Sequence, residues 1–408
     1  MRLLDTHTLE IKEFEHTYAL RYAILSHTWG DQEVSFEYMS GNREALRTLR
    51  GYQKVARFCE EARNRGFKYG WVDTCCIDKR SSAELSEAIN SMYRYYSGAT
   101  VCIIYLSDVF IQDKRTMVDS IKACRWLSRG WTLQELIAAS NRRFFDADWN
   151  LIKDNEELLG AIAEATGIPQ PVLYGERFLS SFSVAERMCW ASKRKTTRAE
   201  DIAYCLMGIF DVNMTPMYGE GAPKAFKRLQ LEIMKSSFDQ TLFAWRGQRS
   251  SSGLLARTPS YFSDTPQLLL WSPRYLAPYQ MTNVGLSIRV IDITARATQE
   301  KGASKVPTSN RQNEPILAVL QCEVKQNREL HTLALYLESV RDVGFWVNGS
   351  TLKAYRRVRC SEWCLVPSKL LIGLDFQEVI VLEDVHMSLV LASKKSDYQK
   401  LADRLQNS

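Results

Sequence analysis

The first 150 residues alternate between short apolar runs and longer amphipathic stretches. Two amphipathic stretches, Glu44–Arg65 and Ala83–Ser97, place apolar side chains at helical spacing, and Gly66 and Gly98 follow as expected at helix ends. Strand-length apolar runs flank these stretches, at Ala23–Ser26, Tyr69–Val72, Val101–Leu106 and Arg143–Phe145. Strands that alternate with helices in this way predict a parallel sheet covered by helices.

Three of the predicted strands end in polar loops. These loops are Ser26–Asp31, Asp73–Lys79 and Ser107–Asp108, and Ser, Asp, His and Trp recur in them. In a doubly wound sheet, ligands bind outside the carboxyl ends of the strands, where the strand order reverses. We therefore expect the functional site among these loops.

The rest of the chain has two further patterns. Amphipathic stretches predict helices at Glu156–Thr166, Val184–Lys193, Ala199–Phe210 and Pro223–Lys235. Short β-type runs follow at Leu286–Ile293, Ile316–Val324, Thr332–Leu337, Tyr355–Val358 and Glu378–Leu382. We thus expect an α/β domain over residues 1–150, a helical extension over 151–240 and a β-rich C-terminal domain over 241–408. The polar stretch Thr298–Glu314 has the composition of a linker.

Composition narrows the class of protein. With 45% apolar and 25% charged residues the chain is typical of a globular protein, and a net charge of +6 without a long basic tract does not imply nucleic acid. No apolar run approaches the roughly 20 residues that span a bilayer, and no secretory signal follows Met1. Ten cysteines, several on apolar faces, are typical of reduced buried thiols. We expect a cytoplasmic protein.

Two candidate ligand sites have plain alternatives. Gly219–Gly221 precedes a predicted helix and could bind an anion at its N-terminus, but a tight turn is the explanation that we favour for the glycines. Cys360 and Cys364 lack a second Cys or His pair at zinc-ligand spacing, so we expect no metal. No P-loop pattern is present, which argues against a Walker-type nucleotidase.

The strand-end loops offer two kinds of chemistry. Cys75 and Cys76 with His27 and Asp73 form a thiol nucleophile, a base and an orienting carboxylate if their loops meet; otherwise the thiols pack beneath a loop. The second kind of chemistry depends on Glu135. This residue lies four residues after Trp131, so a helix places both side chains on one face. A carboxylate near an aromatic ring suits chemistry on a cationic or oxocarbenium-like centre, although such a Glu is also common on solvated helices.

Three motifs together resemble the fungal heterokaryon incompatibility (HET) domain. They are Tyr22–Gly30 (YAILSHTWG), Gly70–Lys79 (GWVDTCCIDK) and Arg129–Leu136 (RGWTLQEL), in the order of that family's signature blocks. Three later stretches resemble the helical extension of large fungal HET proteins, at Asp201–Phe210, Tyr218–Gly221 and Phe226–Gln230. The resemblance implies a role in non-self recognition and programmed cell death.

The HET family is regarded as a distant relative of the Toll/interleukin receptor (TIR) domain, a flavodoxin-like parallel sheet. Ser26 with Asp31 is similar to the first TIR box and Asp73 to the second. Ser128, Trp131 and Glu135 are similar to the segment that carries the catalytic Glu of NAD-cleaving TIR domains, although Thr132 stands where those enzymes usually have Cys. The resemblance therefore implies that Glu135 is the catalytic residue of an NAD+ glycohydrolase.

The cleavage of NAD+ needs few protein groups. Nicotinamide leaves a positively charged pyridinium as a neutral molecule, so one carboxylate that stabilises positive charge on the ribose suffices. We expect the substrate to contact a set of strand-end residues, which are Ser26, His27, Trp29, Asp31, Asp73, Cys76, Arg129 and Trp131. The resemblance further implies a homo-oligomer, a protein partner that triggers it, and no cofactor beyond NAD+ as substrate. Two alternatives are a non-enzymatic module that acts by assembly, and a thiol hydrolase built on Cys76 and His27.

Overall fold

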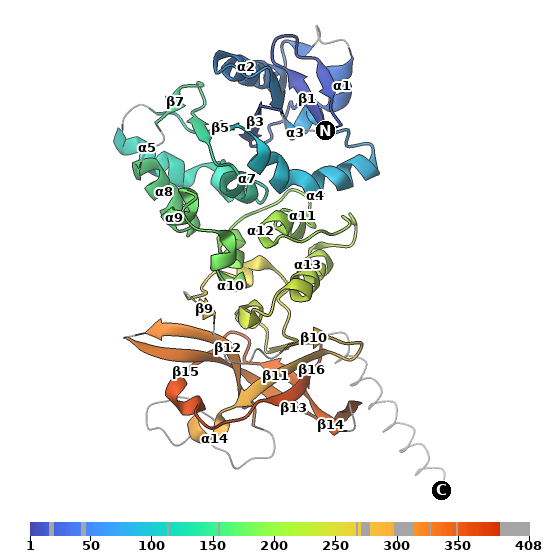
Figure 1. Ribbon diagram of the computed structural model, residues 1–408, viewed down its shortest axis with the longest axis vertical. Helices are drawn as coiled ribbons and strands as arrows, with labels where there is room; N and C mark the ends of the chain where they lie inside the picture. The colour runs from blue at the N-terminus through green and yellow to red at the C-terminus, as the bar shows by residue number, and fades with distance from the viewer. Residues whose placement is uncertain are drawn as a thin grey trace, which may run out of the picture. The chain divides into compact units, whose positions relative to one another are not determined.

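A computed structural model describes residues 1–15, 20–41, 46–111, 114–153, 156–266, 268–270, 278–297, 314–326, 328–347 and 350–383 (Figure 1). The chain divides into two compact units. The first comprises Met1–Phe182 and Lys193–Leu229, and the second comprises Ser183–Ser192 and the residues from Gln230 onward. All of the predicted linker except Glu314 lies outside the described residues.

The first unit is built on a mixed sheet whose strand order is β2-β1-β4-β3-β5-β6-β7. Its strands are β1 (Arg2–Asp5), β2 (Ile11–Glu13), β3 (Tyr22–His27), β4 (Tyr69–Trp71), β5 (Val101–Tyr105), β6 (Arg142–Phe145) and β7 (Leu151–Ile152). The four central strands, β4-β3-β5-β6, are parallel. The prediction of a parallel sheet is confirmed for this centre, at the four places where the apolar runs indicated strands.

The edges of this sheet differ from the prediction. β1 and β2 form an antiparallel hairpin beside β4, and β7 pairs antiparallel with β6. Such edge strands need only a short turn and a few buried residues, such as Leu3 and Leu4, so their sequences carry little periodicity. The sheet is therefore mixed rather than purely parallel.

Helices α2 and α4 make the crossovers that put the three strands β3, β4 and β5 side by side (Figure 1). Helix α2 (Arg50–Asn64) buries Val55, Phe58 and Cys59, and Gly66, at φ +78°, follows its end. Ser81 caps the N-terminus of helix α4 (Ser82–Gly98), where its hydroxyl accepts a hydrogen bond from the Glu84 amide. Because β3 is covered on both sides, all six of its residues are buried.

Shorter helices complete the first unit. They are α1 (Phe36–Ser40), α3 (Asp73–Cys76), α5 (Lys114–Ala123), α6 (Arg125–Ser128), α7 (Thr132–Ala138), α8 (Glu156–Thr166), α9 (Gln170–Leu173), η2 (Leu179–Ser181), α11 (Asp201–Tyr204) and α12 (Met207–Phe210). The predicted helix over Ala199–Phe210 is thus two short helices. The second of them brings Gly208 against Tyr93, where a Cβ atom on the glycine would lie 2.3 Å from the Tyr93 Cβ. Helix α13 (Ala222–Ser236) begins in this unit and ends in the next.

The second unit contains a β-sheet that closes on itself. Its strands are β8 (Ser251–Ser252), β9 (Leu268–Leu270), β10 (Gln280–Met281), β11 (Leu286–Asp292), β12 (Ile316–Gln326), β13 (Glu329–Val347), β14 (Ser350–Val358), β15 (Cys364–Pro367) and β16 (Gln377–Val381). The path β11-β16-β14-β13-β12 returns to β11 through a further β11–β12 pairing. Each β-type run predicted after residue 286 coincides with one of these strands or lies within a residue of it, so the expected β-rich C-terminal part is confirmed.

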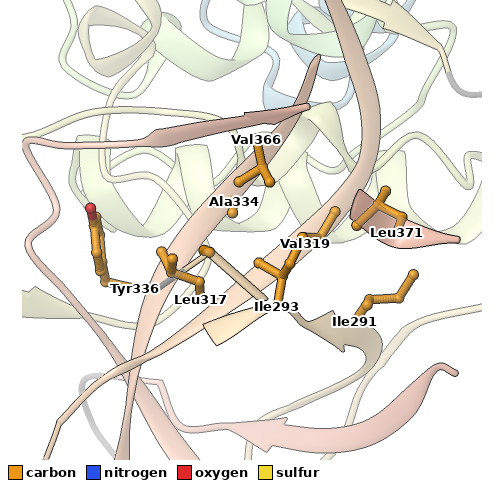
Figure 2. Packing of buried hydrophobic residues seen from close by; sticks show 9 residues of the cluster. Ile291, Ile293, Leu317, Val319, Ala334, Tyr336, Val366 and Leu371 are labelled. Atoms are coloured by element: carbon orange, nitrogen blue, oxygen red, sulfur yellow. The ribbon is translucent and has the colours of Figure 1, made fainter. Parts of the chain in front are cut away.

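Buried apolar side chains fill this barrel-like sheet. Figure 2 shows one cluster, to which Ile291, Leu317, Val319, Ala334 and Val366 contribute from four strands. Helical elements of the same unit are α10 (Val184–Ala191), α14 (Thr294–Ala297), η3 (Gln240–Phe243), η4 (Pro259–Phe262) and η5 (Ser368–Leu371). Helix α10 begins with a capping box, in which Ser183 and Glu186 each accept a hydrogen bond from the other's backbone amide.

In the described parts of the chain we find no helix that combines the length and the apolar character needed to cross a bilayer.

Candidate functional site

The first unit contains a cavity of about 220 Å³ next to the carboxyl ends of β3 and β4. Helix α4 supplies apolar wall residues, Leu85, Ile89 and Met92. Six of the nine site residues expected from the sequence line this cavity: His27, Trp29, Asp73, Arg129, Trp131 and Glu135. The strand-end loops therefore meet in one place, as the doubly wound pattern indicated.

Glu135 is a buried carboxyl group in the first turn of α7. Ser26 donates a hydrogen bond of 2.5 Å to its Oε2 atom, and Trp126 Nε1 donates one of 2.8 Å to Ser26 Oγ. Burial raises the pKa of Glu135 to about 8, the Ser26 hydrogen bond opposes this shift, and the charge of Asp73 adds to it. The carboxyl group is therefore mainly protonated at neutral pH, and a cationic ligand would favour its ionised form.

A chain segment from far along the sequence supports the loop before α7. Gly130 N donates to Lys195 O at 2.9 Å, and Lys195 N donates to Ser128 O at 2.7 Å. A Cβ atom at Gly130 would lie 2.5 Å from Thr196 Cγ2, so this approach requires glycine. The buried Arg194 donates to Thr132 Oγ1 at 3.0 Å, next to Glu135 in space, and burial lowers the pKa of Arg194 to about 10. These contacts fix the start of α7.

The same segment brings a second carboxyl group into the cavity. Trp131 Nε1 donates to Asp201 Oδ2 at 3.1 Å, and the Tyr218 hydroxyl donates to Asp201 Oδ1 at 2.9 Å. Burial raises the pKa of Asp201. The Arg198 guanidinium lies 4.1 Å from the centroid of the Tyr218 ring. Asp201 therefore holds the Trp131 ring in the cavity wall, one helical turn from Glu135.

The mouth of the cavity carries an exposed aromatic ring. Trp29 is 49% exposed, and its Nε1 donates to Asp73 Oδ2 at 2.8 Å. The Lys79 ammonium lies 3.6 Å from the centroid of the Trp29 ring, which is a cation–π contact. An exposed indole held by one carboxylate is available to stack on a planar ligand.

His27 is the last residue of β3 and lies in the cavity wall with 1% of its side chain exposed. Its Nε2 lies 3.8 Å from Glu33 Oε2 and 3.9 Å from Asp73 Oδ1. Burial lowers the pKa of His27 to about 4, with a further contribution from the charge of Lys54. The imidazole is therefore neutral at neutral pH.

Three expected site residues do not line the cavity. Ser26 is fully buried behind Glu135 and orients it. Asp31 lies exposed in the loop after β3. Cys76 is buried in α3, where its sulfur accepts a hydrogen bond from Val72 N at 3.4 Å. A hydrogen bond with Cys76, together with burial, raises the pKa of Cys75 well above its usual range. The thiols thus pack beneath the loop, as the plain alternative predicted.

The fold explains the candidate anion site at Gly219–Gly221. The amides of Gly219 and Gly221 donate to Glu200 Oε1 at 2.9 and 3.0 Å, and both glycines have positive φ. The turn therefore binds the chain's own carboxylate. Within the described ranges, no three His, Cys, Asp or Glu side chains gather in a way that could hold a metal ion.

Sequence reasoning missed several residues that line the cavity. They are Lys79, Tyr96, Arg198, Asp201 and Tyr218, together with apolar residues of α4. Asp201 and Tyr218 belong to stretches whose resemblance to the helical extension was noted above, and that resemblance was the available signal. Local periodicity carried no sign that these stretches complete the site.

Comparison with known proteins gives two family matches and one curated relative. Residues 22–113 match the family described as heterokaryon incompatibility protein (HET), and residues 224–268 match a domain of unknown function, DUF8212. The vegetative incompatibility protein HET-E-1 of Podospora anserina is 47% identical over 222 residues, which cover 52% of this chain and 16% of that protein. The chain thus spans about a sixth of the length of this relative. No solved structure matches.

Proposed function

This chain carries a HET domain, and we propose that it acts in fungal non-self recognition and cell death by cleaving NAD+ between nicotinamide and ribose. Glu135 is the catalytic residue in this proposal. Support comes from the similarity of Ser128–Glu135 to the catalytic segment of NAD-cleaving TIR domains, and from the position of Glu135 in the cavity wall. The parallel centre β4-β3-β5-β6 has the strand order 2-1-3-4 of flavodoxin-like sheets, which favours the TIR-like fold.

The observation that carries the proposal is a buried carboxyl group that lines a cavity between aromatic rings. The cavity volume of about 220 Å³ is below the roughly 300 Å³ at which pockets for drug-sized ligands begin, so it accommodates one end of a dinucleotide. The nicotinamide ring carries a positive charge in NAD+, and the cavity lining includes the aromatic side chain of Trp131, a type of group that attracts such a charge.

The chemistry follows from the charges. When the bond between ribose C1′ and the pyridinium nitrogen breaks, its electron pair leaves with nicotinamide, which becomes neutral. Positive charge then grows on the ribose, where the ionised Glu135 stabilises it. Water adds at C1′ and releases a proton, giving ADP-ribose. Ser26 keeps the carboxylate oriented through its 2.5 Å hydrogen bond, so little reorganisation is needed during the reaction.

The ionisation of Glu135 is coupled to the substrate. Without a cationic ligand the carboxyl group is largely neutral at neutral pH, because burial raises its pKa to about 8. A bound pyridinium stabilises the carboxylate and lowers that pKa, so the charge forms mainly when the substrate is present. A neutral Glu135 also avoids the cost of an unpaired buried anion.

In this proposal the protein acts in the cytoplasm. All ten cysteines are free thiols, which is consistent with the reducing cytoplasm. NAD+ is the substrate rather than a bound cofactor. A second copy of the chain and a protein that signals non-self are the partners we propose.

Nicotinamide release from NAD+ by the purified full chain tests the activity. Glu135→Gln keeps the shape of the side chain but removes the anion, so turnover should fall by about 10²–10³ while substrate binding changes much less. Thr8→Ala, an exposed substitution away from the cavity, is the control and should retain activity. An unchanged rate in Glu135→Gln, or cell killing without loss of NAD+, would refute the enzyme and favour a module that acts by assembly alone.

A further inference from the structure

One buried side chain of the cavity has no hydrogen-bond partner. Neither Nδ1 nor Nε2 of His27 is hydrogen-bonded to any described residue, although both atoms are buried. A buried polar group without a partner is unfavourable, and a ligand that supplies the partner recovers that cost. His27 therefore marks a position at which a bound molecule makes a hydrogen bond.

The groups around His27 determine which hydrogen-bond donors and acceptors that molecule must have. Glu33 Oε2 is also buried without a hydrogen-bond partner, and Asp73 Oδ1 lies at a similar distance from the imidazole. Lys54 is paired with the other oxygen of Glu33, and Lys79 lies over the Trp29 ring. Glu33 does not line the cavity, so the groups at this end that a cavity ligand contacts are the neutral imidazole of His27 and the carboxylate of Asp73, whose oxygens accept hydrogen bonds.

We propose that His27, with the carboxylate of Asp73, binds the carboxamide group of nicotinamide and excludes the carboxylate of nicotinic acid. A carboxamide has an NH₂ group for the acceptor oxygens and a carbonyl oxygen for the imidazole N–H. A carboxylate has no donor and places a negative charge beside Asp73. The inference rests on the proposed function because it takes NAD+ as the source of the carboxamide.

The strand geometry links this contact to Glu135. Ser26 and His27 are consecutive in β3, so their side chains point to opposite faces of the sheet. Ser26 holds the carboxyl group of Glu135, and His27 faces Glu33 and Asp73. The end of one rigid strand therefore positions the group that stabilises the ribose cation and the group that binds the leaving ring.

A comparison of two nearly isosteric ligands tests the inference on the unmodified protein. Nicotinamide and nicotinate are titrated by calorimetry, and kcat/KM is measured for NAD+ and for nicotinic acid adenine dinucleotide. We expect at least tenfold tighter binding of nicotinamide and a preference for NAD+ of about 100-fold or more, since a site built to hydrogen-bond a group strongly rejects an analogue that lacks it. Equal binding of the two free ligands, or equal cleavage of the two dinucleotides, overturns the inference.

The two proposals fail in different ways. If the protein binds nicotinamide but not nicotinate and cleaves neither dinucleotide, the proposed enzyme activity is wrong and the assignment of His27 stands. If both dinucleotides are cleaved at equal rates, the activity stands and the assignment of His27 is wrong.

Variants of His27 give an independent readout. His27→Leu removes both ring nitrogens and should reduce the discrimination between the two dinucleotides to within a few-fold, whereas His27→Asn keeps a donor and an acceptor and should retain part of it. The ratio of two substrates on one preparation does not depend on the amount of folded protein. His7→Leu, at an exposed histidine, is the matched control and should keep the full ratio. A His27→Leu protein with the wild-type ratio contradicts the assignment.

Discussion

Each unit of the chain buries an ionisable side chain, Glu135 in the first and Arg357 in the second, but the surroundings differ. Arg357 is fully buried in β14, and its guanidinium donates to the carbonyl oxygens of Phe243, at 3.0 Å, and Trp245 while it lies 3.9 Å from the centroid of the Trp245 ring. Glu135 instead lines a cavity.

The difference separates a structural charge from a functional one. The protein itself provides Arg357 with carbonyl oxygens and an aromatic face, so its charge stabilises one arrangement of η3 and β14. The carboxyl group of Glu135 accepts a hydrogen bond from Ser26, and the charge of Arg194 lowers its pKa, but burial outweighs both and keeps the pKa at about 8. Its ionised form therefore needs a positive ligand.

The largest expected effect is on the second unit. Arg357→Met removes the charge and leaves buried carbonyl oxygens without their donor, so it should lower the free energy of unfolding by about 3–5 kcal/mol. Denaturant unfolding followed by fluorescence measures this loss. The neighbouring Arg356 has a half-exposed ion pair with Glu338, and Arg356→Met should cost less than about 1 kcal/mol. Equal losses in the two variants would mean that burial does not distinguish these arginines.

Glu135→Gln should change the free energy of unfolding in the opposite direction to Arg357→Met, and stabilise the protein at neutral and higher pH. The folded-state pKa of Glu135, about 8, lies above its value of 4.5 in the unfolded chain, so the folded protein binds more protons between these values. Wild-type stability should therefore fall by about 3 kcal/mol through this group as pH rises from 5 to 8.

Glu135→Gln lacks this fall, so the difference in stability between the two proteins should grow with pH and vanish below about pH 4.5. Unfolding free energies measured at several pH values check the sign. A variant that is less stable than wild type at pH 8 would indicate a structural ion pair instead.

The pH dependence of catalysis is the third expectation. The active form of Glu135 is ionised and its pKa in the free protein is about 8, so kcat/KM for NAD+ should rise about tenfold per pH unit up to that value and then level off. Because the bound pyridinium favours the carboxylate, kcat should level off at a lower pH. A kcat/KM profile that falls between pH 6 and 8 would show that a protonated group is required.

The smallest effect belongs to the buried thiol. Cys76 packs beneath the loop with a weak hydrogen bond from Val72, so Cys76→Ser should cost about 1 kcal/mol or less in stability and leave turnover nearly unchanged. Melting temperature and nicotinamide release on one preparation measure both. Complete loss of activity in a well-folded Cys76→Ser protein would revive the thiol hydrolase.

Much of the fold could be predicted from the sequence. The central parallel strands and the helices α2, α4 and α8 lie where apolar periodicity indicated them, because each buries a continuous face whose spacing is local. The edge hairpin β1–β2 was missed because its short strands bury few residues. The prediction of a single helix over residues 199–210 was wrong, because the chain forms two short helices there. The second of them packs Gly208 against Tyr93, a contact that no local pattern specifies.

The site was predictable only in part, for a similar reason. The spacing of Trp131 and Glu135 requires no more than one turn of helix, and α7 provides it. Asp201 and Tyr218 lie 70 or more residues after Trp131 in the chain. They reach the cavity because Lys195 pairs with the backbone around Gly130. No local pattern encodes that contact.

The sequence alone therefore determined the strands, the main helices and the chemical types at the strand ends, since these depend on neighbours a few residues away. Only the tertiary structure decided which carboxyl group is buried in a cavity, which histidine lacks a partner and which thiols are covered. The physical reason is that burial and charge environment depend on residues from distant segments. The pKa of Glu135 near 8 and that of His27 near 4 arise mainly from burial, and no sequence motif specifies burial.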